Sequence, residues 1–218
     1  AIEYEKKAVE FYESTDLYHK NNLLNYAYGI LGGYYNRKGD LKSANHYRNV
    51  HIKYMKKRFG FGSVEYFDAM FNAYDQFMIQ GYYKTGLDVL LEIHEKLKSQ
   101  PSMVNKAFIA WFGEGKENDP FNKTRFQHTL ARTYVENDKF NEALPIYRKN
   151  LENIQSQREK SSNPKKLLHW ELLTLNDIAL SLQNLHSSTG DNSLLSEAEE
   201  NYLKIIKITK ENEDDKQL

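Results

Sequence analysis

Residues 28 to 44 read Tyr28-x-x-Leu31-Gly32-x-x-Tyr35-x-x-x-Gly39-x-Leu41-x-x-Ala44, and this stretch decides the fold. Apolar residues return at steps of three and four on both sides of Gly39, which is the period of an amphipathic helix. Gly39 can adopt the positive φ that ends a helix. Gly32 lets a second helix approach closely, and Ala44 is its small counterpart. The stretch therefore predicts a helical hairpin over about residues 23–58.

The same spacing returns further along the chain. A second pair, over about residues 64–98, has its turn at Gly81, and 81 − 39 gives a period of 42 residues. A third pair covers about 121–158 with Asp138 in place of the turn glycine. A fourth covers about 165–212 with a longer turn around 187–193. Repetition at such a period predicts stacked helix pairs that bury a shared core.

The remaining segments fit this repeat. Residues 1–20 predict a leading half repeat, and residues 101–120 an insertion that contains a short helix over 103–112. The polar stretch from 211 to 218 predicts a fraying tail. We therefore predict an all-α fold of about four helix pairs, built as a single repeat domain over residues 1–218. The chain opens without Met, which suggests a fragment of a longer protein.

Composition narrows the function. The chain has 30 Lys and Arg residues against 30 Asp and Glu residues. Nucleic acids and anionic membranes select a basic excess, so neither is expected as a partner. No run of about 18 apolar residues is present to span a membrane. The lack of cysteine excludes disulfides and thiolate sites. It is compatible with a reducing compartment, and we expect a cytoplasmic protein.

The combined pattern of small, aromatic, glycine and alanine positions resembles the tetratricopeptide repeat. The period, together with Glu142-Ala143-Leu144-Pro145-Ile146-Tyr147 and Thr174-Leu175-Asn176-Asp177-Ile178-Ala179, looks like its kinesin-light-chain subclass. The resemblance spans nearly the whole chain and implies a right-handed α-α superhelix. The first pair departs from the pattern, because Tyr47 comes one place early and Arg48 stands where the aromatic residue is usual. The aromatic positions are expected to be packing residues between helices.

In such a solenoid the first helix of each pair lines the concave groove, where the resemblance implies that a peptide or protein binds. The candidate binding residues are Tyr26, Arg37, Asn72, Asp75, Arg125, His128, Arg132, Asn176, Asp177 and Gln183, with Asn36 and Asn184 facing the same way. The amides of Asn72 and Asn176 could pair with a peptide backbone. Arg125 and Arg132 could hold a carboxylate. The alternative is that all of these are ordinary solvated residues.

One known ligand of the family is not expected. Members that bind chaperone C-termini hold the terminal carboxylate with a Lys and an Asn in their first repeat. Gly29 and Gly33 stand at those two positions here. We therefore do not predict binding to chaperone tails.

No catalytic set stands out. The seven histidines include no H-E-x-x-H pair, and Gly113-Glu114-Gly115-Lys116 lacks the rest of a phosphate loop. We expect no enzyme activity, no cofactor and no metal, and interpret the chain as a scaffold for a protein or peptide.

Two alternatives stay open. The first is a ligand-sensing repeat domain that controls an attached effector, possibly through contact with another domain of the parent protein. The second is a structural array that associates with itself. Phe108, Trp111 and Phe112 in the insertion could make such a contact, or could instead cover a surface of the repeats.

Overall fold

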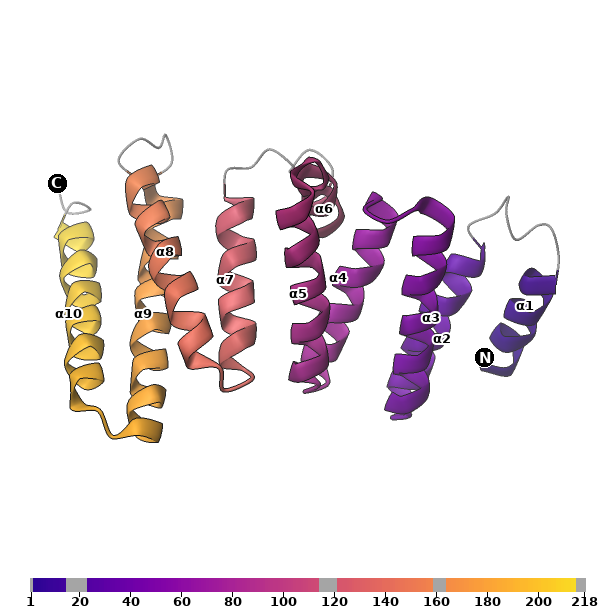
Figure 1. Ribbon diagram of the computed structural model, residues 1–218, viewed down its shortest axis with the longest axis horizontal. Coiled ribbons are helices and arrows are strands. Elements are labelled where there is room, and N and C mark those ends of the chain that lie inside the picture. Colours follow the sequence, from indigo (N-terminus) through magenta and orange to yellow (C-terminus); the bar gives the residue numbers. More distant parts are fainter. Residues whose placement is uncertain (1, 15–22, 114–120, 159–163, 215–218) are drawn as a thin grey trace. The chain divides into compact units, whose positions relative to one another are not determined.

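The computed structural model describes residues 2–14, 23–113, 121–158 and 164–214 (Figure 1). These residues form ten α-helices and a 3₁₀ helix, with no strand among them. The helices are α1 (Ile2–Ser14), α2 (Leu23–Arg37), α3 (Leu41–Phe59), α4 (Val64–Ile79), α5 (Tyr83–Ser99), η2 (Pro101–Met103), α6 (Val104–Phe112), α7 (Asn122–Val135), α8 (Phe140–Arg158), α9 (Pro164–Thr189) and α10 (Asn192–Asp214). The prediction of an all-α helical-repeat fold is confirmed.

The helix ends follow from the residues that the sequence places there. Gly39 and Gly81 adopt φ values of 80° and 75° at the turns of the first two pairs. Asp138 takes the same left-handed conformation with φ 56° in the third pair, which Asp tolerates better than most residues. Ser63 caps α4 by accepting a hydrogen bond from the backbone N–H of Tyr66 at 3.1 Å, as predicted.

The chain divides into two compact units, Ala1–Asn118 (the N-terminal unit) and Asp119–Leu218 (the C-terminal unit). We describe each unit by itself. Organisation as a single domain stays a prediction.

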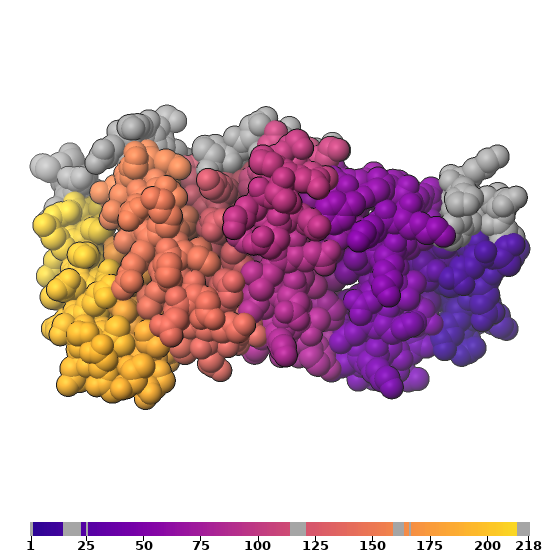
Figure 2. All heavy atoms as spheres, in the orientation of Figure 1, coloured from indigo at the N-terminus to yellow at the C-terminus, as the bar shows by residue number. Residues whose placement is uncertain are grey.

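In the N-terminal unit each helix packs on the next from α1 to α5. Leu31, Ala44, Phe67 and Phe77 are buried in its core. A Cβ atom built on Gly32 would lie 3.6 Å from the carbonyl oxygen of Ala44, which confirms the close approach of α2 and α3. Side chains fill most of the space between the ribbons of this unit (Figure 2).

The insertion helix α6 packs on α4. The ring of Trp111 stacks on Phe71 with 4.4 Å between centroids, and Phe108 is buried. The aromatic side chains of α6 are therefore used within the N-terminal unit.

In the C-terminal unit α7 to α10 also pack in succession. Tyr147 and Leu182 are fully buried there, and Tyr35 is buried at the matching place in the N-terminal unit. These tyrosines pack between helices, as the sequence predicts.

The predicted long turn around 187–193 is wrong. Helix α9 continues to Thr189, and Gly190 ends it with φ 74°. The hydroxyls of Ser187 and Thr189 donate to the carbonyls of Gln183 and Leu185 one turn earlier, at 2.9 Å each. The extra residues of the fourth pair therefore lengthen the helix, because polar hydroxyl residues can also satisfy themselves on a helix backbone.

Several expectations lie outside the described residues. They concern residues 15–20 of the leading half repeat, the loop over 114–120, the polar break at 159–163 and the last residues of the tail.

Candidate functional site

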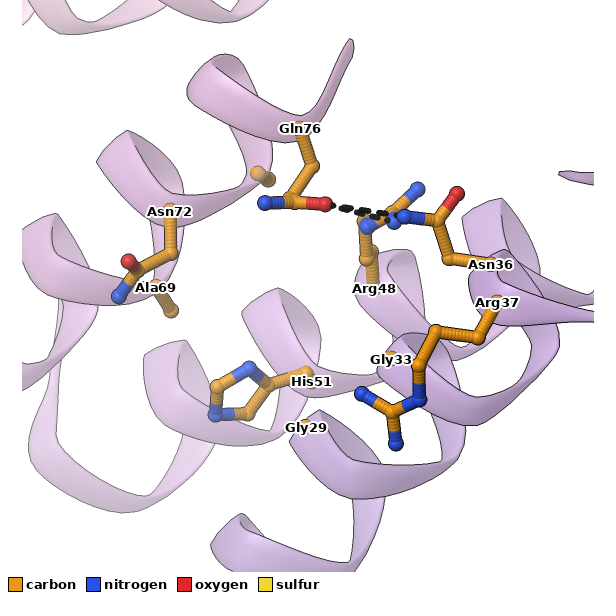
Figure 3. A pocket seen from close by; sticks show the side chains of 10 residues that line it. Gly29, Gly33, Asn36, Arg37, Arg48, His51, Ala69, Asn72 and Gln76 are labelled. Carbon is orange, nitrogen blue, oxygen red and sulfur yellow. Dashed lines mark hydrogen bonds between the residues drawn. The ribbon is translucent and has the colours of Figure 1, made fainter. Parts of the chain in front are cut away.

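A pocket of about 370 Å³ opens in the N-terminal unit between α2, α3 and α4 (Figure 3). This volume falls within the range of small-ligand sites. The described residues that line it are Gly29, Gly33, Asn36 and Arg37 on α2, Arg48 and His51 on α3, and Ala69, Asn72, Ala73 and Gln76 on α4. Two consecutive first helices and the helix that connects them thus contribute to one site.

Gly29 and Gly33 lie one turn apart on α2 and leave its surface bare. A Cβ atom on Gly29 would have no heavy atom within 4 Å, and one on Gly33 would meet only Nη1 of Arg37 at 3.8 Å. Each glycine in a helix interior costs roughly 1 kcal/mol relative to alanine. Since no neighbouring side chain requires either glycine, their structural effect is to keep the pocket open.

Arg48 brings a buried positive charge to the pocket. Its side chain is 8% exposed, and burial lowers its pKa, although a guanidinium stays charged at neutral pH. It donates three hydrogen bonds, to the amide oxygens of Asn45 at 2.7 Å, Gln80 at 3.3 Å and Gln76 at 3.4 Å. All three acceptors are neutral, and no described carboxylate pairs with this guanidinium.

The amides around Arg48 form a closed ring of hydrogen bonds. Asn36 donates to Oε1 of Gln76 at 3.3 Å, and Gln80 donates to Oδ1 of Asn36 at 2.7 Å. With the bonds from Arg48 to both glutamines, the ring joins α2, α3 and the end of α4. It fixes the orientations of Arg48 and Gln76 at the wall of the pocket (Figure 3).

The other walls carry three further polar side chains. The exposed Arg37 lies over the ring of Tyr34, with its Cζ 4.7 Å from the centroid. Burial lowers the pKa of His51 to about 4, so this ring is neutral at pH 7. The amide nitrogen of Asn72 donates to Asp68 at 3.1 Å. The lining residues include two arginines and no Asp or Glu, so the pocket is electropositive.

Four of the predicted groove residues belong to the N-terminal unit. Arg37 and Asn72 line the pocket, and Asn36 joins them there. Tyr26 is 63% exposed on α2, outside the lining. Asp75 is exposed on α4, and partial desolvation raises its pKa.

Sequence reasoning missed Arg48, His51 and Gln76 as site residues. The available signals were Arg48 in the place of an aromatic residue and the glycine pair on α2.

In the C-terminal unit His128 and Asp177 meet instead of facing solvent separately. His128 is 6% exposed, unlike the exposed position that the repeat register predicts, and its Nε2 lies 3.0 Å from Oδ2 of Asp177. Its ring packs edge-on against Tyr147 and Trp170, at 5.4 and 5.3 Å between centroids. Burial and the nearby carboxylate of Asp177 raise the pKa of Tyr147. This cluster joins α7, α8 and α9.

The other predicted residues of this unit are not brought to one place. Arg125 and Asn176 are half-buried, whereas Arg132 is exposed with Nε 3.9 Å from Oε1 of Glu136. Gln183 accepts a hydrogen bond from the hydroxyl of Tyr202 at 3.2 Å. Their role in a groove stays a prediction.

No protein-family model matches the chain, and neither does any curated protein. Within the described residues, no group of three or more His, Asp or Glu side chains is placed to hold a metal ion. None of the described helices combines the length and apolar character needed to cross a membrane.

Proposed function

We propose that the chain is a non-catalytic cytoplasmic scaffold that binds a peptide or protein on the first helices of its helix pairs. The observation that carries this proposal is the pocket between α2, α3 and α4, because two consecutive first helices place polar side chains around one open volume. The resemblance to tetratricopeptide repeats points to the same surface.

The pocket offers the groups that an extended peptide needs. The amide nitrogen of Asn72 is held by Asp68, which leaves its oxygen to accept from a peptide N–H. Tyr26 and Ile30, 63% and 40% exposed, present apolar surface on the same helix as the glycine pair. Backbone pairing beside an apolar contact is a common way to hold a peptide in a groove.

Selection from a library of random linear peptides on the immobilised full chain tests the proposal. We expect a set of binders whose affinity falls at least about tenfold in an Arg37→Glu/Asn72→Ala double variant, since loss of one good polar contact is worth about 1.4 kcal/mol. The matched control is Lys53→Glu/Asn49→Ala, which changes exposed residues of α3 outside the pocket. Equal binding by the two double variants would remove the groove from the function.

A further inference from the structure

We infer that the pocket takes a peptide carboxylate whose neighbouring side chain is apolar, an inference that rests on the proposed function. The carboxylate would enter between Arg37 and Arg48, above Gly29 and Gly33. The apolar neighbour would rest on Tyr26 and Ile30.

Charge gives the first argument. Arg48 is buried with only neutral amide oxygens as acceptors. A buried cation without a counter-ion is costly, and an incoming anion recovers part of that cost. Its three hydrogen bonds use three of the five N–H donors of a guanidinium. Arg37, whose guanidinium contacts the ring of Tyr34 and no described carboxylate, supplies a second cation.

Space gives the second argument. The volume of about 370 Å³ is larger than a carboxylate needs, and the bare surface over Gly29 lets a peptide backbone lie close to α2. Close backbone approach is a recurring use of glycine. A larger residue at either glycine would fill this space without touching the rest of the unit.

The apolar stripe of α2 gives the third argument. Tyr26, Ile30, Gly33 and Arg37 follow each other at steps of four, three and four residues, so they share one face of the helix. Two large apolar side chains thus lie exposed directly along the helix from the arginine. A ligand that spans this stripe needs an apolar group beside its anionic group.

The protonation of His51 fits this ligand. Its pKa of about 4 leaves a neutral ring that can donate one hydrogen bond at pH 7 without competing for the carboxylate as a third charge. The amide oxygen of Asn72 accepts from the backbone beside the carboxylate. The site therefore reads charge, backbone and apolar character together.

The test uses the binders selected from the random library and a set of synthetic variants of each. One variant replaces the acidic residue by its amide (Glu→Gln or Asp→Asn), and another carries an amidated C-terminus. We expect the selected peptides to be enriched in an acidic residue or free C-terminal carboxylate next to an apolar residue. Loss of that carboxylate should weaken binding roughly tenfold to hundredfold on the wild-type chain. The two variants identify whether the carboxylate comes from a side chain or from the terminus.

Two protein variants place the carboxylate in the pocket. On Arg37→Gln the acidic peptide and its amide should bind within about twofold of each other, since the charge that distinguishes them is gone. Gly29→Leu should abolish binding while the melting temperature stays at or above that of the wild type, because no atom opposes the new side chain. Asn49→Leu on the exposed face of α3 is its control and should bind normally.

Each outcome decides something. Binders that lack acidic groups, or that lose nothing on conversion to the amide, would overturn the inference and leave the scaffold function standing. Normal binding by Gly29→Leu would also overturn it, because the ligand would then lie outside the pocket. A library that yields no binder at all would instead overturn the proposed function.

Discussion

Nη2 of Arg48 on α3 donates to Oε1 of Gln76 on α4 at 3.4 Å, across 28 residues of sequence. This contact links two consecutive helix pairs through a buried charge and a neutral amide. Because Gln76 also accepts from Asn36, the helices of the pocket share one hydrogen-bond ring. The stability of the N-terminal unit and the charge of its pocket thus depend on the same side chains.

Gln76→Glu should supply the counter-ion that Arg48 lacks. The introduced carboxylate would sit beside a guanidinium, which holds its pKa below the usual value of about 4.3. A depressed carboxyl pKa stabilises the folded state above the unfolded pKa, so a gain of about 1 kcal/mol at pH 7 should disappear as the pH falls below about 4. Urea unfolding of the variant at pH 7 and pH 3.5 measures this.

Tryptophan fluorescence can report the N-terminal unit alone in that experiment. The chain has two tryptophans, Trp111 in the N-terminal unit and Trp170 in the C-terminal unit, so a Trp170→Phe background isolates the first. Asn49→Asp adds the same charge at an exposed place and serves as the control. A stability gain no larger than that of the control would show that Arg48 is already compensated.

Gly32 should respond in opposite directions to a small and a large side chain. A Cβ atom there would lie 3.5 Å from Cγ of Arg48, an ordinary contact, so Gly32→Ala should stabilise the unit by roughly 0.5–1 kcal/mol through its helix propensity. Gly32→Leu should cost about 1–3 kcal/mol, because its further atoms reach into α3. Thermal melts followed by Trp111 fluorescence compare the two. Similar melting temperatures would mean that α2 and α3 are not tightly packed.

His51 should make the N-terminal unit sensitive to mild acid. Its pKa is lowered to about 4 by desolvation, whereas an unfolded histidine titrates near 6.5. Between these values the unfolded chain binds more protons, so stability should fall as the pH drops from about 6.5 to 4, by at most about 1.4 kcal/mol per pH unit. Arg37 and Arg48 in the same pocket oppose protonation as well.

Urea unfolding between pH 4.5 and pH 7.5 checks this dependence. His51→Gln should flatten the profile over that range, whereas His46→Gln at an exposed position should leave it unchanged. Parallel profiles for the wild type and His51→Gln would contradict the prediction.

Arg158 should matter through the carboxylate that it covers. Its Nη1 lies 2.6 Å from Oε2 of Glu171, whose side chain is only 2% exposed, while Gln155 donates to Oε1 at 2.9 Å. Arg158→Met leaves that carboxylate without a cation and should cost about 2–4 kcal/mol, less than a fully buried pair because Arg158 is partly solvated. Trp170 fluorescence in a Trp111→Phe background reports the unfolding of the C-terminal unit.

Removing the charge of the partner separates this effect from lost packing. The double variant Arg158→Met/Glu171→Gln should recover most of the loss, since the neutral amide no longer needs a cation. If the double variant is as unstable as the single one, the packing of the Arg158 side chain dominates.

The glycine pair shows where the sequence was informative without being understood. Gly29 and Gly33 were recognised only as a mismatch to a carboxylate clamp, and Arg48 only as a departure from an aromatic position. The structure places all three around one pocket with His51 and Gln76. These residues lie on three helices, and no local pattern indicates which helix faces meet.

The sequence by itself determined the helices and their turns, because helical periodicity and glycine conformation act over a few residues. It predicted the turns at Gly39 and Gly81 and the cap at Ser63 from local chemistry alone. It misjudged the end of α9, where hydroxyl side chains satisfied by the helix backbone extend it to Thr189. Only the tertiary structure decided that His128 is buried against Asp177 and that Arg48 lies in an amide ring. Burial and charge pairing depend on which helix faces meet, and residues far apart in the chain determine that.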